Sequence, residues 1–456
     1  MTQAVPPPAS VRSEIRHQFR LAWPVMLASL NWTLLHLTDI YVVGLTGTHE
    51  VAVFGASRTL TYIAFMVQIG ALAGVLVYAS RADGAGDKRG TGDAFREGLL
   101  LALAFGLVVA LPYFLFAEPL LAGIGVASAL VPEAASVIRI MALAMPFQLA
   151  IIAIANFFEG ISHPKRVALI NLAILPLNAA LAWAWSGGHL GFPALGAEGA
   201  ALATLVSLAI GAAAFLMSAL LMRDARERGL TDWSVRRWLA ALPGTWRLAK
   251  FGTVPAIASG LELAGFSWLI ALSTQLGEAA THAFQIIFSL HNLTFSTAIG
   301  FASAAGVRVG NAVGEGLYQD ARRRTAIALA LGIASMALFV LAYWLFADSI
   351  VAAFPGDPAV ILLAVQMLLL WIPFILFDGA QIVFTFALRS LGDQVAAGVN
   401  NILAFFVVTG VGGWWLVSNG WGTAGLVYAS GLGMVASALL NGTRFWWVSA
   451  NSPSSR

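Results

Sequence analysis

Three acidic residues stand inside long apolar stretches of the sequence, where a charged side chain is costly. Asp39, Glu262 and Asp378 are each flanked on both sides by mostly apolar residues. A charged Asp at the centre of a membrane helix costs about 2.5–3.5 kcal/mol on insertion scales, so such a group usually faces a bundle interior or an aqueous cavity. These three carboxylates are therefore the first candidates for a functional site.

The chemistry available to a buried carboxylate is ion exchange. Burial disfavours its charged form, which allows proton exchange near neutral pH, and its oxygens can also hold Na⁺. Either ion competes with a cationic substrate for the same negative charge. When bound ion and bound substrate exclude one another, and each favours a different facing state, the protein works as an antiporter.

Each carboxylate has an aromatic residue on its own helix face: Trp32 with Asp39, Phe266 with Glu262, and Phe374 with Asp378. His36 shares the face of Asp39. A carboxylate beside an aromatic ring suits an organic cation, which gains from both the charge and the ring quadrupole. The alternative is that the rings only pack against lipid or neighbouring helices. Each carboxylate would then pair with a buried cation such as Arg58 or Arg139 and hold helices together.

The chain around these residues has the composition of a membrane protein. Of its 456 residues, 59% are hydrophobic and only 10% are charged, whereas a soluble domain carries about 25% charge. A membrane helix needs roughly 20 apolar residues, and the sequence contains 12 runs of this kind. These runs are too long, and alternate too little, for the strands of a β-barrel. We predict an all-α integral membrane protein with 12 transmembrane helices. Cysteine is absent, which excludes disulfides and thiolate chemistry.

Basic residues lie almost entirely on one side of the predicted spans. Two of the 25 Lys and Arg residues, Arg58 and Arg139, fall within spans, and the other 23 lie in the N-terminal tail, the connections on its side and the C-terminal end. The positive-inside rule then places both termini in the cytoplasm. The first apolar run contains Asp39 and no small-residue cleavage site, so we interpret it as a span and not as a signal peptide. We expect a multi-pass protein of a bacterial-type plasma (inner) membrane.

The sequence contains an internal repeat of two halves. A long basic connection divides the spans six and six, and the two halves resemble each other at an offset near 227 residues: Pro146-Phe147 recurs as Pro373-Phe374. Because six is even, both halves enter the membrane from the same side, and the repeat is parallel. The predicted organisation is an N-terminal tail (1–19), an N-lobe (20–222), a cytoplasmic linker (223–247), a C-lobe (248–447) and a C-terminal tail (448–456).

Longer motifs around these residues carry a family resemblance. The first half contains AWPVMLASLNWTLLHLTDIYVVGLTG, which includes Asp39, and the second half contains VPAIASGLELAGFSWLIALSTQLG and FDGAQIVFTFALRSLGDQ, which include Glu262 and Asp378. Over about residues 18–445 the chain resembles the multidrug and toxic-compound extrusion (MATE) family, in its NorM-like branch. The resemblance implies two six-helix lobes around a central cleft that export drugs in exchange for H⁺ or Na⁺.

The resemblance also implies roles for particular residues. Asp39 matches the N-lobe carboxylate, and Glu262 and Asp378 match C-lobe acidic residues linked to cation coupling, which would bind the metal ion if the coupling ion is Na⁺. Gln285 matches a cleft glutamine, and Ser57 matches a cleft serine. The predicted ion-coupling residues are Glu262, Asp378 and Asp39, and the predicted substrate-binding residues are Asp39, Asp378, Gln285, Ser57 and Phe374.

One position departs from a neighbouring branch of the family. Asn178 stands where the DinF-like branch has an Asp, which argues against a coupling scheme based on an acidic pair in the N-lobe. The predicted function is a cation-coupled antiporter that exports organic, cationic drugs by alternating access between two lobes. Beyond the coupling ion, H⁺ or Na⁺, we expect no cofactor, no catalytic residue and no nucleic acid partner. The expected partners are small organic cations and the lipid bilayer, with the chain as a monomer.

Three other classes of function have less support in the sequence. An enzyme would need a motif such as HExxH, a P-loop or GxSxG, none of which occurs. A flippase for lipid-linked anionic substrates of the same superfamily would need cations in the cleft, which Arg58 and Arg139 could supply. A channel is disfavoured by the two-lobe duplication, because pores sit on rings of several elements.

Overall fold

The structure is a computed structural model that describes residues 10–451 of the chain. The remaining parts of the two predicted tails, residues 1–9 and 452–456, lie outside the described residues. Every regular element from residue 10 to residue 451 is a helix, which confirms the predicted all-α class. Eleven helical segments in this part of the chain are long and apolar enough to cross a membrane. The protein is therefore a multi-pass membrane protein.

The first predicted span is not among these eleven segments. α1 (Val11–Gly44) is a continuous helix of 34 residues, but Asn31, His36 and Asp39 interrupt its apolar residues. These polar side chains lower the mean hydropathy of the helix. The total of 12 spans thus stays a prediction, because α1 has the length but not the composition of an ordinary span.

Contacts within the chain divide it into two compact units. Within the described residues, the N-terminal unit comprises residues 27–83 and 87–260, and the C-terminal unit comprises residues 10–26, 84–86 and 261–451. Two long helices, α1 and α9 (Val235–Thr274), contribute residues to both units. The boundaries of the predicted lobes stay a prediction.

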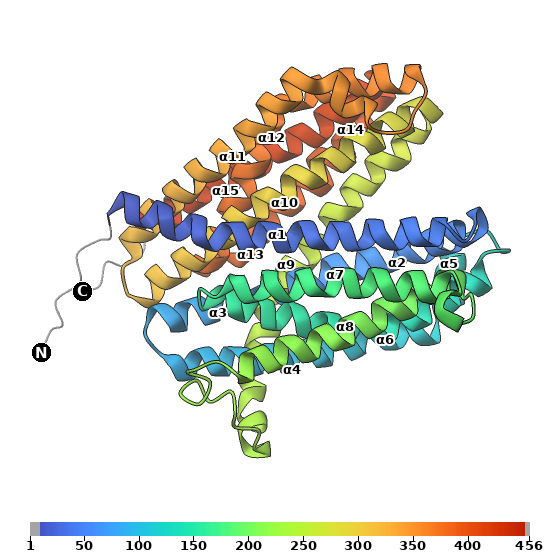
Figure 1. Cartoon of the computed structure of the whole chain (residues 1–456). Helices are drawn as coiled ribbons and strands as arrows, with labels where there is room; N and C mark the ends of the chain where they lie inside the picture. Colours follow the sequence, from blue (N-terminus) through green and yellow to red (C-terminus); the bar gives the residue numbers. More distant parts are fainter. Residues whose placement is uncertain (1–9, 452–456) are drawn as a thin grey trace, which may run out of the picture. The chain divides into compact units, whose positions relative to one another are not determined.

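The N-terminal unit is a helical bundle. Besides its parts of α1 and α9, it contains α2 (Thr48–Ala71), α3 (Ala73–Gly84), α4 (Lys88–Leu115), α5 (Ala117–Gly123), α6 (Val131–Gly160), α7 (Pro164–Ser186), the short 3₁₀ turn η1 (His189–Gly191) and α8 (Gly196–Leu220). α6 packs against α4 and α8, and α7 packs against α8 (Figure 1). At Gly199 a Cβ atom would lie 2.6 Å from the backbone nitrogen of Ser186, so the close approach of α8 to α7 requires glycine.

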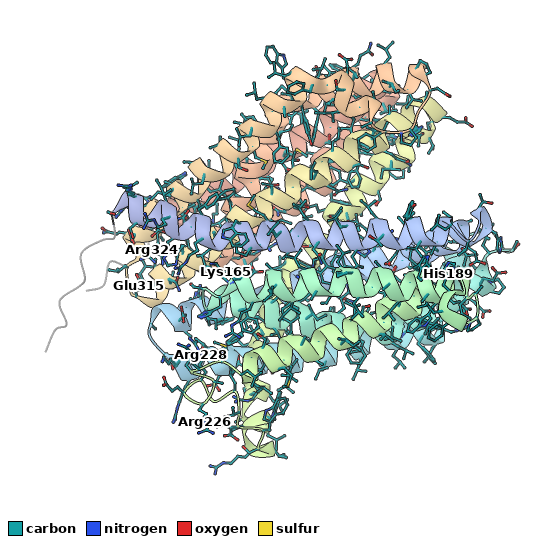
Figure 2. The ribbon with its side chains drawn as sticks, in the orientation of Figure 1. Lys165, His189, Arg226, Arg228, Glu315 and Arg324 are labelled. Carbon is teal, nitrogen blue, oxygen red and sulfur yellow. The ribbon has the colours of Figure 1, made fainter. Side chains whose placement is uncertain are left out.

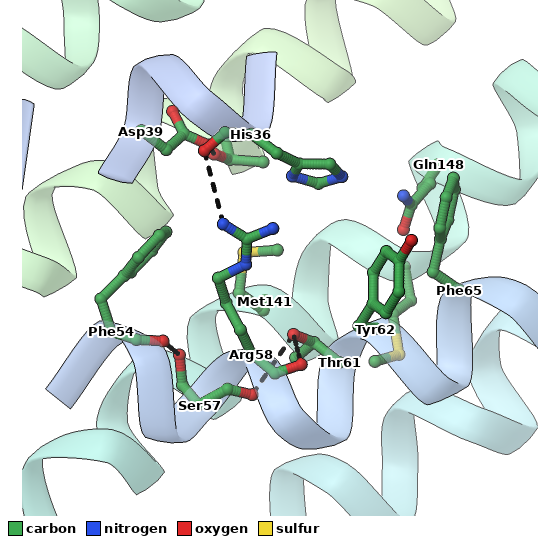
Figure 3. Close-up of a pocket in the computed structure, with 12 residues that line it drawn as sticks. His36, Asp39, Phe54, Ser57, Arg58, Thr61, Tyr62, Phe65, Met141 and Gln148 are labelled. Carbon is green, nitrogen blue, oxygen red and sulfur yellow. Dashed lines mark hydrogen bonds between the residues drawn. The ribbon is translucent and has the colours of Figure 1, made fainter. Parts of the chain in front are cut away.

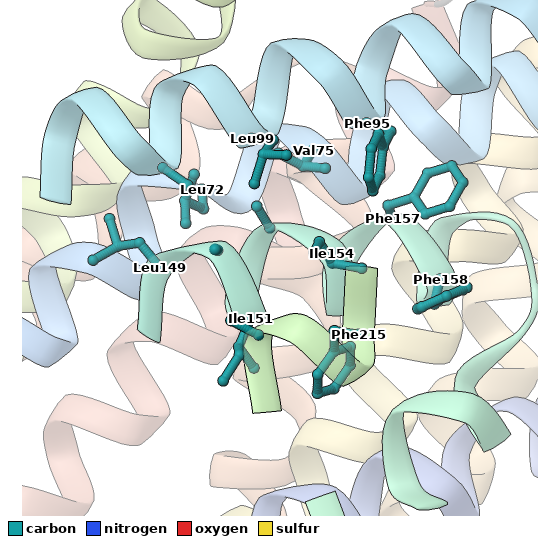
Figure 4. Packing of buried hydrophobic residues seen from close by; sticks show 14 of the residues in the cluster. Leu72, Val75, Phe95, Leu99, Leu149, Ile151, Ile154, Phe157, Phe158 and Phe215 are labelled. Atoms are coloured by element: carbon teal, nitrogen blue, oxygen red, sulfur yellow. The ribbon is translucent and has the colours of Figure 1, made fainter. Parts of the chain in front are cut away.

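Aromatic and branched side chains fill the centre of this bundle (Figure 4). The rings of Phe95 and Phe157 lie edge to face with centroids 5.1 Å apart, and Phe157 and Phe158 lie 5.6 Å apart. Phe157, Phe158 and Phe215 are fully buried. Residues so large and so deeply buried hold α4, α6 and α8 in one arrangement, because a close-packed interior tolerates little change in shape.

The C-terminal unit is a second bundle. Besides its parts of α1 and α9, it contains α10 (Glu278–Gly314), α11 (Tyr318–Ala352), α12 (Pro358–Leu391), α13 (Gln394–Asn401), the π-helix η2 (Ile402–Val411), α14 (Gly412–Ser418) and α15 (Gly422–Asn451). α12 is its central helix and packs against α10, α11 and α15. At Gly265 of α9, a Cβ atom would lie 2.2 Å from the carbonyl oxygen of Phe405 in η2, so a side chain is excluded there. A π-helix is rare and often marks a functional region.

Several basic side chains lie at one end of the N-terminal unit. Figure 2 shows Lys165, Arg226 and Arg228 at one end and His189 at the opposite end. Nη1 of Arg228 donates to Oγ1 of Thr91 at 2.6 Å, so the basic segment after α8 is fixed against the bundle. This is the sided distribution on which the predicted topology depends. Which end faces the cytoplasm stays a prediction.

A buried ion pair and a hydrogen bond hold the start of α1 against other helices of the C-terminal unit. Nε and Nη2 of Arg308 donate to the two carboxylate oxygens of Glu14 at 2.8 and 2.6 Å. Nε2 of Gln18 donates to the carbonyl oxygen of Arg324 at 2.7 Å. Arg324 in turn forms an ion pair with Glu315, and both residues are labelled in Figure 2. Bidentate pairing of arginine with a carboxylate is both strong and geometrically specific.

Candidate functional site

The N-terminal unit contains a pocket around the predicted carboxylate Asp39 (Figure 3). The pocket draws its lining from several helices of this unit, α1, α2, α6 and α8. Its polar lining includes His36, Asp39, Ser57, Arg58, Tyr62 and Gln148, and its apolar lining includes Phe54, Phe65, Met141 and Met145. The sequence prediction named Asp39 and Ser57 as substrate-binding residues, and both line this pocket.

Asp39 is held by two neutral hydrogen-bond donors. Nδ2 of Asn178 donates to Oδ1 at 2.5 Å, and Oγ1 of Thr204 lies 3.3 Å from Oδ2. The carboxylate is buried, so these partners meet the requirement that buried polar groups be hydrogen-bonded. Because both donors are uncharged, they orient the carboxylate without neutralising it. Asn178, noted in the sequence as a departure, is therefore the main partner of Asp39.

The two arginines within predicted spans have different surroundings. Arg58 lines the pocket, and its Nη1 donates to the carbonyl oxygen of His36 at 3.4 Å. Arg139 instead pairs with Glu118, with Nη2 and Oε1 2.8 Å apart, and does not line the pocket. Ser57, beside Arg58, donates its hydroxyl to the carbonyl oxygen of Phe54 at 2.7 Å. Of the two buried cations proposed from sequence, only Arg58 is placed to meet a ligand in this pocket.

Asp378 lies in the C-terminal unit beside a histidine. Nε2 of His291 is 3.0 Å from Oδ2 of Asp378, and Nε2 of Gln381 donates to Oδ1 at 3.3 Å. Aromatic rings surround the imidazole: its centroid is 5.5 Å from that of Phe266 and 5.2 Å from that of Trp371. The carboxylate, the imidazole and the rings thus come from α9, α10 and α12.

Glu262 belongs to the same region but has different contacts. It lies half-buried on α9, and within the described residues it has neither a hydrogen bond nor an ion pair of its side chain. Phe266, one helical turn after Glu262 on α9, contacts the imidazole of His291 that lies beside Asp378. The two predicted C-lobe carboxylates thus belong to two helices, α9 and α12, that both contribute to the surroundings of His291. In the part of the chain that is described, no cluster of three or more His, Asp or Glu side chains forms a metal site.

Polar side chains extend from Asp378 through the interior of the C-terminal unit. Gln381, which contacts Asp378, has its Oε1 3.2 Å from Oγ of Ser437, and that hydroxyl is 3.0 Å from Oδ1 of Asn401. Nδ2 of Asn441 donates to the same Oδ1 at 2.7 Å. All five residues are buried. The network connects α12, α13 and α15 and ends where the π-helix η2 begins.

Two predicted substrate-binding residues lie away from the pockets described here. The side chain of Gln285 is exposed on α10. Phe374 packs on α15, where its ring meets that of Tyr428 edge to face at 6.2 Å. A smaller pocket of about 220 Å³ in the C-terminal unit is lined by Phe266, His291 and other residues, but by neither of these two. Their roles in substrate binding stay predictions.

Sequence reasoning did not single out His291, Thr204 or the network around Asn441. A signal was available for His291, because Phe288 and Phe295 lie three residues before and four after it on the same helix face. Ser437 and Asn441 are likewise four residues apart. Thr204 carried no signal, because a threonine hydroxyl on a helix usually bonds its own backbone, as this one also does to Ala200 at 3.1 Å.

Comparison with known proteins places this geometry in a family context. The family described as MatE matches residues 24–184 and 256–415, one stretch in each half of the chain. A probable multidrug resistance protein NorM from Xanthomonas axonopodis pv. citri is 31% identical over 97% of this chain and 96% of its own. Another from Deinococcus radiodurans is 31% identical over 96% of each chain. The multidrug resistance protein PmpM of Pseudomonas aeruginosa is 25% identical over 88% of this chain and 83% of its own.

Solved structures share the fold. An outward-facing multidrug resistance MATE family transporter of the MOP superfamily superposes with a TM-score of 0.86, at 18% identity over 96% of each chain. The eukaryotic MATE transporter AtDTX14 superposes with a TM-score of 0.85, at 18% identity over 95% of this chain and 96% of its own. At this identity the likeness concerns the arrangement of helices alone.

Proposed function

This chain belongs to the MatE family, and from that premise we propose that it is a multidrug efflux transporter driven by exchange against H⁺ or Na⁺. The names of its relatives support multidrug efflux rather than an enzyme activity. We place it in a bacterial-type inner membrane with both termini in the cytoplasm, as a monomer. The positive-inside distribution of its basic residues supports that orientation.

One observation carries the proposal. Two intramembrane carboxylates stand in the C-terminal unit: Asp378 of α12 contacts His291, and Glu262 of α9 lies one helical turn before Phe266, whose ring centroid is 5.5 Å from that of the same imidazole. Two nearby carboxylates resist being charged together, so a proton or Na⁺ bound there relieves their repulsion. Such a site is loaded and unloaded by an ion gradient, which is what an antiporter requires of its coupling site.

The pocket in the N-terminal unit supports the proposal that the protein binds a cationic substrate. Asp39 lines the same pocket as the rings of Tyr62 and Phe65, a combination that suits an organic amine or quaternary cation. Coupling then requires that the ion and the drug favour different facing states of the two lobes. A ligand can shift the equilibrium between the two facing states only if it binds one state more tightly than the other.

The test is transport in reconstituted vesicles. Purified protein is placed in liposomes loaded with ethidium, and efflux is followed by fluorescence under an imposed pH gradient or Na⁺ gradient. We expect one gradient to drive efflux, and Glu262→Gln or Asp378→Asn to reduce the driven rate about tenfold or more, because hydrogen bonds and charge interactions of buried ionised groups are worth that much. Glu278→Gln, which changes an exposed carboxylate at the start of α10, is the matched control. Efflux that neither gradient drives would overturn the proposal.

The flippase alternative has one remaining support. Of the two arginines that favoured an anionic lipid-linked substrate, Arg139 is already paired with Glu118, which leaves Arg58 alone. A fluorescent lipid-linked anion incorporated in the same vesicles decides between the two. Movement of that lipid between leaflets, without efflux of ethidium, would favour the flippase.

A further inference from the structure

The helix α9 is longer than a membrane crossing requires. It has 40 residues, which at 1.5 Å per residue extend about 60 Å, whereas the hydrocarbon core of a bilayer is about 30 Å thick. Residues 251–274 suffice to cross that core. Residues 235–250, the start of α9, then extend beyond it, and in Figure 1 this yellow-green part runs across the direction of α4 and not along it.

One face of the start of α9 is packed on the N-terminal unit. Ala241 and Leu248 are buried, and Oγ1 of Thr245 is 3.4 Å from the carbonyl oxygen of Glu97 on α4. At Gly244 a Cβ atom would collide with the carboxylate of Glu97, so the two helices approach closely there. The orientation of the segment about its own axis is thus fixed by packing.

Another face of the start of α9 is an exposed apolar stripe. Four residues at intervals of four, three and four share this face, and each is at least half exposed: Val235, Leu239, Leu242 and Trp246. Two basic residues, Arg236 and Lys250, lie exposed beside the stripe. Within the described residues neither of them forms a salt bridge. The segment therefore presents apolar surface and unneutralised positive charge together.

The start of α1 has the same arrangement in the other unit. Its buried residues are polar: Glu14 pairs with Arg308, and Gln18 donates to the carbonyl oxygen of Arg324. Its exposed residues form an apolar stripe and, one position later, a basic stripe: Val11, Ile15 and Phe19, then Arg12, Arg16 and Arg20. In the described part of the chain none of these three arginines forms a salt bridge. A helix that buries polar and exposes apolar side chains is the reverse of a helix on a water-soluble protein.

The two segments correspond in the internal repeat. At the offset of 227 residues, Ile15, Phe19 and Arg20 fall on Leu242, Trp246 and Arg247. Each half of the chain thus begins with an exposed apolar stripe bordered by basic residues. The same surface occurs twice, on two helices that bury different kinds of side chain beneath it. Packing against the bundle therefore does not account for the exposed stripes.

We propose that the starts of α1 and α9 bind anionic phospholipids at the membrane surface. A basic helix with an apolar stripe lies in the interface, its apolar side chains at the acyl boundary and its Lys and Arg at anionic headgroups. A phospholipid matches both stripes, because one molecule carries a charged phosphate and an apolar tail. A soluble anion matches only the charges, and an apolar protein surface matches only the stripe.

The inference goes beyond the proposed function, because it concerns the outer surface and not the pockets. It still touches the transport machinery at one point. α1 carries Asp39 and α9 carries Glu262, so the helices that meet the lipid are those that carry two of the predicted coupling residues.

Native mass spectrometry of the whole chain tests the inference. Purified protein is equilibrated in detergent with equal amounts of phosphatidylglycerol and phosphatidylcholine of the same acyl chains, and the lipids that stay bound are counted by mass. We expect about tenfold more phosphatidylglycerol than phosphatidylcholine on the protein. The preference should fall as the ionic strength rises, because salt screens exposed charges. Equal retention of the two lipids would overturn the inference.

Charge variants then assign the preference to the two segments. Arg236→Gln combined with Lys250→Gln should lower the preference several-fold, and adding Arg12→Gln and Arg16→Gln should remove most of it. The matched control is Arg237→Gln, since Arg237 neighbours Arg236 but is paired with Asp232 at 3.4 Å. A preference that the fourfold variant leaves unchanged would contradict the assignment.

Variants of the apolar stripe keep the test decisive if the charge variants fail to fold. Leu239→Gln should lower the retention of both lipids several-fold while the basic residues stay in place. Leu190→Gln changes an equally exposed leucine of η1, far along the unit near His189, and should leave retention unchanged. Equal effects of the two leucine variants would show that the stripe has no particular role.

Two further outcomes would replace the lipid by another partner. Displacement of phosphatidylglycerol by an equal concentration of glycerol 3-phosphate would mean that the basic residues bind a soluble anion, and would overturn the inference. A dimer mass that disappears in Leu239→Gln would assign the stripe to a second copy of the chain, with the same consequence. None of these measurements needs an ion gradient, so their outcome is separate from that of the efflux experiment.

Discussion

Asn178 of α7 donates a hydrogen bond from its side-chain amide to Oδ1 of Asp39 of α1, across 2.5 Å. The partner is a neutral amide, so it fixes the orientation of the Asp39 carboxyl group without adding a charge. An aspartate at position 178 would instead confront Asp39 with a second negative charge at the same distance. The identity of one residue on α7 therefore decides whether the N-terminal unit carries a single carboxylate or an acidic pair.

Replacing Asn178 with leucine should weaken the binding of cationic ligands. The change leaves Asp39 with Thr204 as its recorded hydrogen-bond donor, and a hydrogen bond to a charged group is worth about 1.5–3 kcal/mol. We expect the Kd for ethidium, measured by fluorescence in detergent, to rise about tenfold. Asn156→Leu is the control, because Asn156 donates to the carbonyl oxygen of Leu72 in the same unit at 3.1 Å. Equal weakening in both variants would mean that the fold, not Asp39, was disturbed.

Replacing His291 with leucine should impair ion coupling. The imidazole touches Asp378 at 3.0 Å, and its loss leaves a buried carboxylate with one fewer partner. We expect gradient-driven ethidium efflux to fall about tenfold, and His291→Gln to retain more activity than leucine, because an amide can still donate. His282→Gln, on the same helix but outside the described pockets, serves as the control. Normal efflux in His291→Leu would show that the contact is only structural.

The network around Asn441 should contribute measurably to stability. Nδ2 of Asn441 is placed to bond Asn401 at 2.7 Å and Thr385 at 3.2 Å, in a fully buried setting. Asn441→Leu removes both of these buried hydrogen bonds and leaves Oδ1 of Asn401 with the hydroxyl of Ser437 as its donor, at a cost of about 1–3 kcal/mol. The thermal unfolding temperature in detergent should therefore drop, whereas Asn419→Leu, at an exposed site after α14, should change it little. A temperature unchanged in both variants would refute this.

The ion pair between Glu14 and Arg308 should make stability depend on pH. Glu14 precedes the apolar part of α1. Burial raises the pKa of Glu14, but the hydrogen bonds and charge of Arg308 outweigh it, and the net pKa lies below the ordinary 4.5. A depressed carboxylate pKa stabilises the folded state fully at a pH above the unfolded-state value, and the effect is lost as the pH falls through the folded-state pKa.

The corresponding experiment compares Glu14→Gln with the wild-type protein across pH. We expect the variant to unfold at a lower temperature at pH 7, because Arg308 loses its charged partner in a buried site. The difference should shrink as the pH falls below about 4.5 and the wild-type carboxyl takes up a proton. Glu278→Gln, at an exposed carboxylate, should show no such convergence. A difference that stays constant as the pH falls from 7 to well below 4.5 would contradict the assigned role.

Much of the fold could be predicted from the sequence, because the signals of a membrane helix lie within a short stretch of the chain. Long apolar runs, sided basic residues and a repeat offset near 227 residues are properties of neighbouring positions in the chain. The helical class followed from them. The run around Asp39 is also a helix, α1, although it is more polar than the eleven segments that have the length and composition of a membrane span.

The candidate site could likewise be predicted only in part. Asp39, Glu262 and Asp378 could be named from sequence, since a carboxylate in an apolar run is unusual wherever it occurs. Their partners could not. Asn178 and Thr204 meet Asp39 from residues 139 and 165 positions away, and His291 reaches Asp378 across 87 positions. Spacing along one helix says nothing about which neighbouring helix supplies the other half of a contact.

The sequence by itself determined that this is a helical membrane protein with acidic residues inside its spans, because burial in lipid constrains composition directly. The tertiary structure alone decided what those residues face. It paired Arg139 with Glu118 at 2.8 Å and left Arg58 without a carboxylate partner among the described residues. Two arginines that look alike in sequence thus differ in their surroundings, because their partners are side chains that only helix packing brings together.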